Sequence, residues 1–370
     1  MTCFQLPDPV PWTLLAGPLA TAEDAVARLD ERLARSPIRD GWIERTHFSD
    51  ATDSLWLSGE LVHIEDLVLH DAHMDVRAPT HAITRAHAIL RARRRVIESE
   101  SEWALSTVGL ESLRGRPGGV QTRLAGKGGP PRIGDEDEIE VAEWDASEGQ
   151  DALAQELAEI DTILARSEQA LAGNGSRGEK EPLVYDIDWD EDERLAEWLA
   201  AVEPTSELPP VLAAAIALDA WEAIEPLQHF AWLGQILAAA LLRKRGKTRA
   251  HLLCLNTGLR AVPRERRRAS NREWRLVSFV EAICAAAERG LQDHDRWLLA
   301  RRQLERRLAD RRSTSKLPRL IEFIMSRPLV SAGMIAAELS ITSRAAQNLV
   351  AELGLRETTG RSRYRAWGVF

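Results

Sequence analysis

Residues 317–370 read LPRLIEFIMSRPLVSAGMIAAELSITSRAAQNLVAELGLRETTGRSRYRAWGVF. Ser331 and Thr342 each precede a short helical pattern, and serine and threonine are favoured caps for the first free N–H groups of a helix. A short turn at Ser340 separates the two patterns, and Gly354 supplies a stop after the second. This arrangement predicts a helix-turn-helix. The apolar positions of its second helix are Ala346, Leu349, Val350 and Leu353.

The opposite face of this second helix is polar, because the apolar positions recur at helical spacing and must face a core. The following stretch, 355–367, predicts two short strands around a turn at 359–361, with arginines alternating along the return strand. Arginine, glutamine and asparagine can pair with base edges, and a basic wing can contact phosphates. We therefore predict a winged helix-turn-helix that binds double-stranded DNA, a small helical cap being the alternative. The predicted DNA-binding residues are Thr342, Ser343, Arg344, Gln347, Asn348, Arg361, Arg363 and Arg365.

The composition is that of an ordinary globular protein. Of 370 residues, 44% are hydrophobic and 28% charged, and the length predicts two or three domains. The three cysteines have no paired spacing, so neither a disulfide framework nor a zinc cluster is indicated, and no cofactor is expected. The most apolar segment, 230–242, is too short to span a bilayer, and the N-terminus lacks a basic region typical of signal peptides. We expect a cytoplasmic protein without a membrane partner.

Charge is divided unevenly along the chain. Residues 1–240 contain 20 Lys and Arg against 45 Asp and Glu, a net charge of −25. Residues 241–370 contain 28 against 12, a net charge of +16. A basic C-terminal third is typical of a protein that presents one end to a polyanion, although mutual attraction between the two parts would give the same pattern.

The rest of the chain predicts a mainly α fold. Helices are expected over 21–36, 53–70, about 79–113, 211–224, 230–242 and 270–290, with another over 291–312. Gly- and Pro-rich stretches at 114–134 and 172–181 read as linkers around an acidic segment. The predicted domains are an N-terminal helical region (1–113), linkers with an acidic helical segment (114–194), a helical core (195–312) and the winged helix-turn-helix (313–370).

Five of the nine histidines lie between residues 63 and 87, beside the acidic residues of the run HDAHMD at 70–75. Histidine and carboxylate ligands could form a metal site. The spacing matches no zinc motif, however, and one helix cannot direct all these side chains to one point. No metal site is predicted.

The order of elements from residue 209 onward resembles that of Fic-domain proteins with a C-terminal winged helix. In that family, two core helices flank a loop with the motif H-P-F-x-D-G-N-G-R, and a short apolar segment and further helices follow. Here IEPLQHFAWLGQILAAALLRKRG (224–246) stands at the motif position and HLLCL (251–255) at the segment. The chain also resembles a bacterial family in which an uncharacterised domain precedes a helix-turn-helix.

The resemblance does not extend to the catalytic residues of Fic enzymes. Their histidine acts as a general base, their glycine-rich loop binds nucleotide phosphates, and a carboxylate serves Mg²⁺. Glu225 stands at the position of the base, and Phe230 and Trp232 stand where glycines would leave backbone amides free for phosphate. Gln235 lies near the position of the phosphate-binding arginine, and no arginine or lysine matches it. The resemblance implies a Fic-like body without catalytic activity.

We therefore expect a DNA-binding transcriptional regulator that is not an enzyme, and a homodimer is compatible with this function. Two alternatives stay open at this stage. One is a divergent nucleotidyl (AMP) transferase that acts on a protein hydroxyl, which the missing glycines disfavour. The other is an interaction module whose winged helix binds protein, which the basic wing disfavours.

Overall fold

The computed structural model describes residues 4, 9–74, 78–115, 189–308, 316–357 and 365–369. Contacts along the chain define two compact units, residues 1–118 with 190–370, and residues 119–189. All but one residue of the second unit lie outside the described ranges, and with them the predicted acidic segment and most of both predicted linkers.

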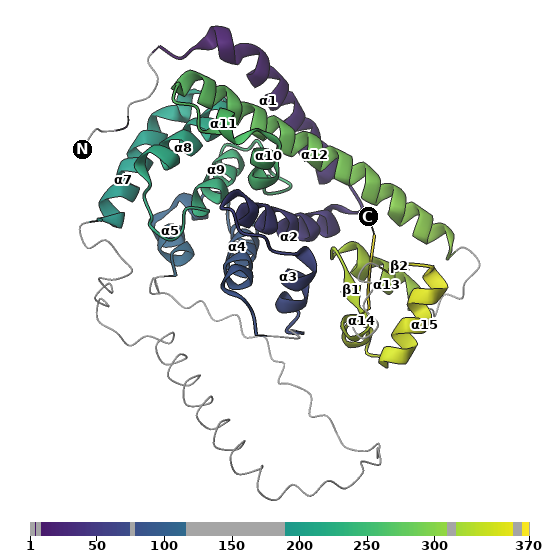
Figure 1. Ribbon diagram of the computed structural model, residues 1–370. Coiled ribbons are helices and arrows are strands. Elements are labelled where there is room, and N and C mark those ends of the chain that lie inside the picture. Colours follow the sequence, from purple (N-terminus) through teal and green to yellow (C-terminus); the bar gives the residue numbers. More distant parts are fainter. Residues whose placement is uncertain are drawn as a thin grey trace, which may run out of the picture. The chain divides into compact units, whose positions relative to one another are not determined.

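The first unit is mainly helical and ends in a helix-turn-helix domain with a small three-stranded sheet (Figure 1). Its elements are α1 (Trp12–Ala34), α2 (Arg39–Leu57), α3 (Ile64–Asp71), α4 (His81–Glu98), η1 (Trp103–Leu105), α5 (Thr107–Leu113), α7 (Glu191–Val202), η2 (Glu203–Glu207), α8 (Pro210–Ile224), α9 (Leu233–Lys244), α10 (Leu255–Ala261), α11 (Arg264–Arg267), α12 (Arg272–Arg306), α13 (Leu317–Met325), β1 (Val330–Ser331), α14 (Ala332–Leu339), α15 (Ser343–Leu353), β2 (Arg356–Glu357) and β3 (Ala366–Gly368).

Helix α12 is the longest element and packs against α1, α8 and α10 (Figure 1). The predicted helix end at Gly290 is wrong, because α12 continues through this residue to Arg306. A side chain at Gly290 would place its Cβ 2.8 Å from Leu29 Cδ2. The glycine therefore permits close packing with α1 instead of ending the helix.

Three further helix boundaries differ from the prediction. α1 begins at Trp12 and continues through Pro18, so Thr21, where the helix was expected to begin, lies in its interior. The expected helix 53–70 is interrupted, because α2 ends at Leu57 and Gly59 adopts a φ of 88° before α3 begins. The expected long helix to residue 113 is divided into α4, η1 and α5.

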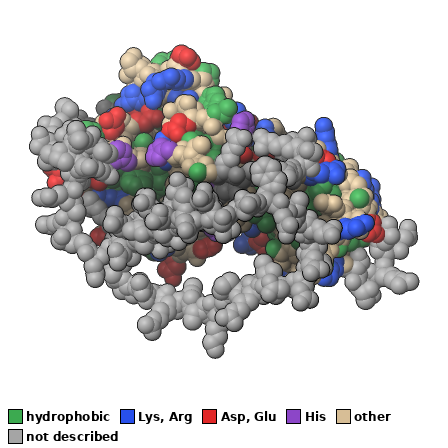
Figure 2. Space-filling view, turned by 60° about the horizontal axis from the view of Figure 1, so that its bottom comes forward, with side chains coloured by type: hydrophobic (Ala, Val, Ile, Leu, Met, Phe, Trp, Pro, Cys, Tyr) green, Lys and Arg blue, Asp and Glu red, His purple; other side chains and the backbone are tan. Residues whose placement is uncertain are grey.

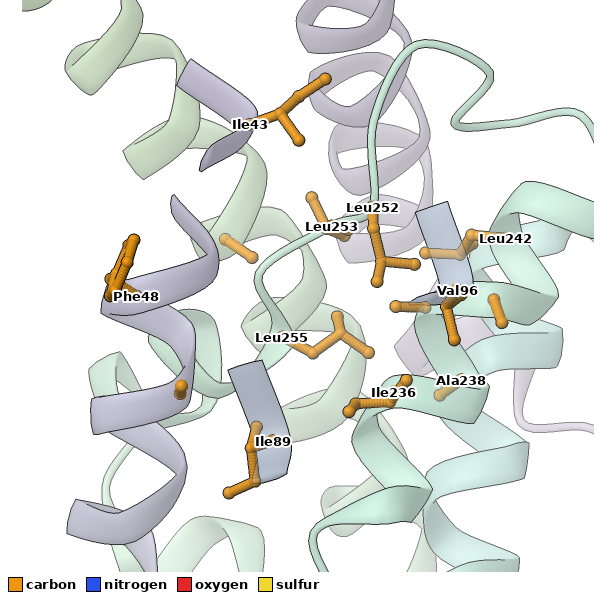
Figure 3. Close-up of a cluster of buried hydrophobic side chains, with 14 of the residues drawn as sticks. Ile43, Phe48, Ile89, Val96, Ile236, Ala238, Leu242, Leu252, Leu253 and Leu255 are labelled. Atoms are coloured by element: carbon orange, nitrogen blue, oxygen red, sulfur yellow. The ribbon is translucent and has the colours of Figure 1, made fainter. Parts of the chain in front are cut away.

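The prediction of two core helices is confirmed in α8 and α9. Twelve of the fifteen residues of α8 are buried, as are nine of the twelve in α9. Figure 3 shows side chains of α9 packed with those of α2, α4 and the segment 252–255. Helices that are apolar on almost every face lie in the interior, because no face of theirs favours water.

A buried ion pair joins α2 and α4 within this interior. Arg93 and Asp50 are 1% and 0% exposed, and their side chains lie 2.5 Å apart. Arg93 also donates to the carbonyls of Leu252 and Leu253, at 3.2 and 3.5 Å. Asp50 accepts the backbone N–H of Asn256, at 2.9 Å, and so acts as a cap for α10 from another helix. A charged pair taken out of water is tolerated only with such additional hydrogen bonds.

His47 completes the surroundings of this pair. Its Nδ1 accepts a hydrogen bond from Arg93 Nε at 3.3 Å. Burial, together with the nearby charge of Arg93, holds the pKa of His47 well below its usual value. The ring is therefore neutral and can accept this bond.

We expect Asp50→Ala to lower the free energy of unfolding by about 3–5 kcal/mol, because it leaves the Arg93 guanidinium buried without its carboxylate. Chemical denaturation followed by circular dichroism measures this change. Asp24→Ala is the matched control, since Asp24 forms an exposed pair with Arg28 and should cost less than about 1 kcal/mol. Equal losses in the two variants would show that the buried pair is unimportant for stability.

Candidate nucleic-acid interface

Helices α14 and α15 form the predicted helix-turn-helix. The Ser331 hydroxyl accepts the N–H of Met334 at 3.2 Å, and the Thr342 hydroxyl accepts that of Ala345 at 3.2 Å. Both predicted caps are thus confirmed. The turn passes through Ser340, whose φ of 51° is left-handed and reverses the chain after α14.

The two faces of α15 are as predicted. Ala346, Val350 and Leu353 are buried, and Leu349 is half-buried against the same core. Ser343, Arg344, Gln347 and Asn348 are all exposed, as are Ala351 and Glu352 nearer the end of the helix. Gly354 ends the helix with a φ of 60°. Because the core holds the apolar face, the outer side chains are available to a partner.

The sheet contains the two predicted strands and one that was not predicted. Its order is β1-β3-β2, and all neighbours are antiparallel. Strand β1 lies before α14 and pairs Val330 with Trp367. Two residues with little alternation cannot be recognised as a strand locally, because β1 exists only through its pairing with β3.

The arginines of the predicted wing are only partly described. Arg365 pairs with Glu357 on the neighbouring strand: its Nε donates to the Glu357 carboxylate at 2.8 Å, and this hydrogen bond raises the pKa of Arg365. About half of the Arg365 side chain is exposed, so a phosphate can still approach it. Arg361 and Arg363 lie outside the described residues, as does the turn at 359–361.

Two basic residues that were not predicted to have a role donate hydrogen bonds to the last carbonyls of α14 and α15. Arg307 donates to the carbonyls of Leu353 and Gly354 at the end of α15. Lys316 Nζ donates to Leu339 O at 2.8 Å, at the end of α14. The last carbonyls of a helix lack partners within it and carry partial negative charge, so a cation there stabilises the helix. The sequence carried no signal of this role, because the carbonyls that these residues bond lie 46 and 23 residues further along the chain.

The histidine-rich region forms no recognisable metal site among the described residues. The rings of His70 and His87 meet edge to face at 4.8 Å, and His87 Nε2 lies 3.2 Å from Asp71 Oδ1. Arg94 donates to both oxygens of Asp71. Burial by itself raises the pKa of Asp71. The hydrogen bonds with His87 and Arg94 outweigh this effect and hold the pKa well below its usual range. Figure 2 shows histidine side chains on one face, among acidic and basic ones.

The loop between α8 and α9, which was expected from the sequence to stand at the position of the Fic motif, is filled by aromatic side chains. Glu225 ends α8 in a left-handed conformation, with a φ of 48°, and is exposed. The rings of Phe230 and Trp232 meet at 5.7 Å, and Trp232 is 8% exposed. Trp221 Nε1 donates to Ala231 O at 3.0 Å, which fixes the loop backbone against α8.

No helix among the described ranges combines the length and apolar character needed to cross a lipid bilayer.

The C-terminal geometry is that of a DNA-binding domain of the helix-turn-helix class, and residues 317–370 match a family model described as "HTH DNA binding domain". Residues 183–309 match a second one, "Protein of unknown function (DUF1612)". The chain is 47% identical over 371 aligned residues to "Uncharacterized protein y4cF" of Sinorhizobium fredii (strain NBRC 101917 / NGR234). That alignment covers 96% of this chain and 97% of the relative. The chain therefore belongs to the same family as y4cF, with a DUF1612 domain followed by a C-terminal helix-turn-helix DNA-binding domain.

We expect Thr342→Val to destabilise α15 by about 1 kcal/mol, because valine has the same shape but cannot accept the Ala345 N–H. Hydrogen exchange of the α15 amides measures this local change. Ser343→Ala is the matched control, since Ser343 is an exposed neighbour inside the helix and does not cap it. Faster exchange in both variants to the same extent would contradict a capping role for Thr342.

Proposed function

We propose that this protein is a DNA-binding transcriptional regulator and that the outer face of α15 reads its operator. The observation that carries this proposal is the exposed set Arg344, Gln347 and Asn348 on the second helix of a helix-turn-helix DNA-binding domain. Arginine can donate twice to guanine, and the amide side chains can pair in a bidentate manner with adenine. In this class the second helix enters the major groove.

The start of α15 supports a phosphate contact. Thr342 and Ser343 are exposed at the N-terminus, where free N–H groups and the helix dipole favour an anion. Arg361, Arg363 and Arg365 would contribute contacts to the DNA backbone or minor groove. Such contacts supply affinity that depends on salt and carries little sequence information. A homodimer would present two reading helices to a palindromic operator.

We further propose that the helical body is Fic-like and non-catalytic. The buried Trp232, with Phe230 against it, occupies the loop in which a Fic enzyme exposes backbone amides to phosphate. Glu225 is exposed, and the described residues 226–232 that follow it offer no such anion site to hold a substrate for a base. This body would serve oligomerisation or the binding of a partner.

Substitutions on α15 and substitutions on the basic wing should weaken DNA binding in different ways. Gln347→Ala or Asn348→Ala should weaken binding to a specific fragment by about 1–3 kcal/mol and leave binding to scrambled DNA nearly unchanged. Arg363→Ala should weaken both and flatten the dependence of affinity on salt. Fragments selected by the whole protein from genomic DNA supply the specific duplex, and titrations at several salt concentrations give the affinities.

Gln303→Ala is the matched control for Gln347→Ala, because Gln303 is an exposed amide on α12. It should leave both affinities unchanged. If the α15 variants weaken specific and scrambled duplexes equally, α15 does not read the sequence. If no genomic fragment is retained, the regulator proposal fails.

The non-catalytic body gives a separate prediction. Incubation of the protein with labelled nucleotides, Mg²⁺ or Mn²⁺ and cell extract should label no protein, because the 225–232 loop offers no phosphate site. A catalytically active Fic protein is the positive control. Labelling that disappears in Glu225→Ala would overturn the proposal and support a nucleotidyl transferase.

A further inference from the structure

Helix α2 of the body approaches the helix-turn-helix domain more closely than a side chain permits. A Cβ added at Gly41 would lie 2.7 Å from the carbonyl oxygen of Met325 and 3.1 Å from its carbonyl carbon. Both atoms belong to the backbone at the end of α13, so they cannot turn aside as a flexible side chain would. Gly41 is thus required by the contact between two backbones.

One turn further along α2, Arg45 enters the helix-turn-helix domain. It is 4% exposed, and its Nη1 donates to Ile324 O at 3.3 Å and Arg327 O at 2.5 Å. Its Nη2 donates to Val369 O at 2.5 Å. The guanidinium also lies over the ring of Trp297 on α12, 4.5 Å from the ring centroid. One side chain of the body therefore bonds the end of the domain's first helix and the residue that follows its last strand.

Arg45 is a buried cation that forms no ion pair with any carboxylate among the described residues. Burial, followed by the nearby charge of Arg296, lowers the pKa of its guanidinium, as expected for a charge removed from water. The end of α13 takes the place of a carboxylate, because Ile324 belongs to its last turn, where carbonyls carry partial negative charge. The Trp297 ring adds a cation–π contact.

Apolar packing between the body and this domain is also buried, but the other polar contacts between them are more exposed than that of Arg45. Arg301 on α12 pairs with Glu322, whose side chain is 60% exposed, and such pairs contribute little to stability. Asp71 lies 3.3 Å from Arg327, but it already accepts from Arg94. The buried, multiply bonded and geometrically specific contact is that of Arg45.

We propose that Arg45 is a positioning residue that holds the helix-turn-helix domain on the body in one orientation. The body then sets the direction in which the outer face of α15 points. The consequence for DNA recognition rests on the proposed function, whereas the fixed orientation does not. A residue that only stabilises the fold would change unfolding but leave the orientation of the folded protein unchanged.

Spin-label distance measurement on the full chain tests the orientation directly. One label at Arg91→Cys on α4 and one at Ala337→Cys on α14 report the body and the domain, since both positions are exposed. The background carries Cys3→Ser and Cys284→Ser. Cys254 can stay, because it is buried and burial raises the pKa of its thiol to about 12, which keeps it unreactive.

We expect one narrow distance distribution in the labelled parent protein and a broad one in Arg45→Met. Methionine is apolar, and replacement of a buried charge by an apolar side chain is often tolerated by the fold. Arg45→Lys should restore part of the narrow population, because lysine keeps the charge but lacks the planar fork that reaches three carbonyls. Arg39→Met is the matched control on the same helix, since the exposed Arg39 pairs with the exposed Asp40, and it should leave the distribution narrow.

Gly41→Ala provides a second perturbation that leaves Arg45 in place. The added methyl group should shift the mean distance, because it must push Met325 away. Circular dichroism at the same temperature establishes that each variant is folded. If Arg45→Met unfolds, the distance distributions of Gly41→Ala and Arg45→Lys decide whether Arg45 fixes the orientation. A broad distribution in the parent, or an unchanged narrow one in the Arg45 variants and in Gly41→Ala, would overturn the proposal.

A DNA-binding measurement separates this inference from the proposed function. Arg45→Met should keep the ratio of specific to scrambled affinity within about twofold, because the side chains of α15 are unchanged. In Arg45→Met, the efficiency of energy transfer between a dye at position 91 and a second dye at the end of a bound duplex should have a broader distribution. If no genomic fragment binds, the regulator proposal fails while the spin-label result still decides the role of Arg45. A tenfold loss of that ratio in Arg45→Met would show that the structure of the reading surface on α15 depends on Arg45, and would overturn a role limited to orientation.

Discussion

A buried charge must find a partner, and in this protein the pair Arg93–Asp50 meets that constraint by joining three distant segments. Arg93 on α4 bonds the carbonyls at 252–253, and Asp50 on α2 caps the start of α10. Neither group can be satisfied unless α2, α4 and this segment are all in place. The apolar cluster of Figure 3 takes side chains from the same three segments and from α9, so burial and hydrogen bonding favour one arrangement.

Helix α2 extends this dependence to the rest of the first unit. Trp42 donates to the carbonyl of Gly290 in α12, Arg45 bonds the helix-turn-helix domain, and Asp50 bonds α4 and α10. Successive turns of one helix thus contact the longest helix, the DNA-binding domain and the core. A helix that is buried on most faces while rich in polar residues is held by hydrogen bonds as much as by apolar packing.

This use of polar residues explains where prediction from the sequence failed and where it succeeded. Most of α2, with polar residues such as His47 and Asp50, has no clear apolar stripe, so no helix was predicted over 39–52. Gly290 reads as a helix end, but it permits the approach of Leu29. In α15, by contrast, apolar spacing, the cap Thr342 and the stop Gly354 all agree, and the buried and exposed faces were predicted correctly.

The sequence by itself determined the class of the C-terminal domain, the two apolar core helices and the outward face of α15. These features depend on residues a few positions apart, whose spacing, caps and stops act through local geometry. Only the tertiary structure decided the third strand β1, the cations at the helix ends and the place of Arg45. Each of these contacts joins residues far apart in the chain. A side chain such as Arg45 looks like any surface arginine in the sequence, and only packing shows that backbone carbonyls, instead of water, surround it.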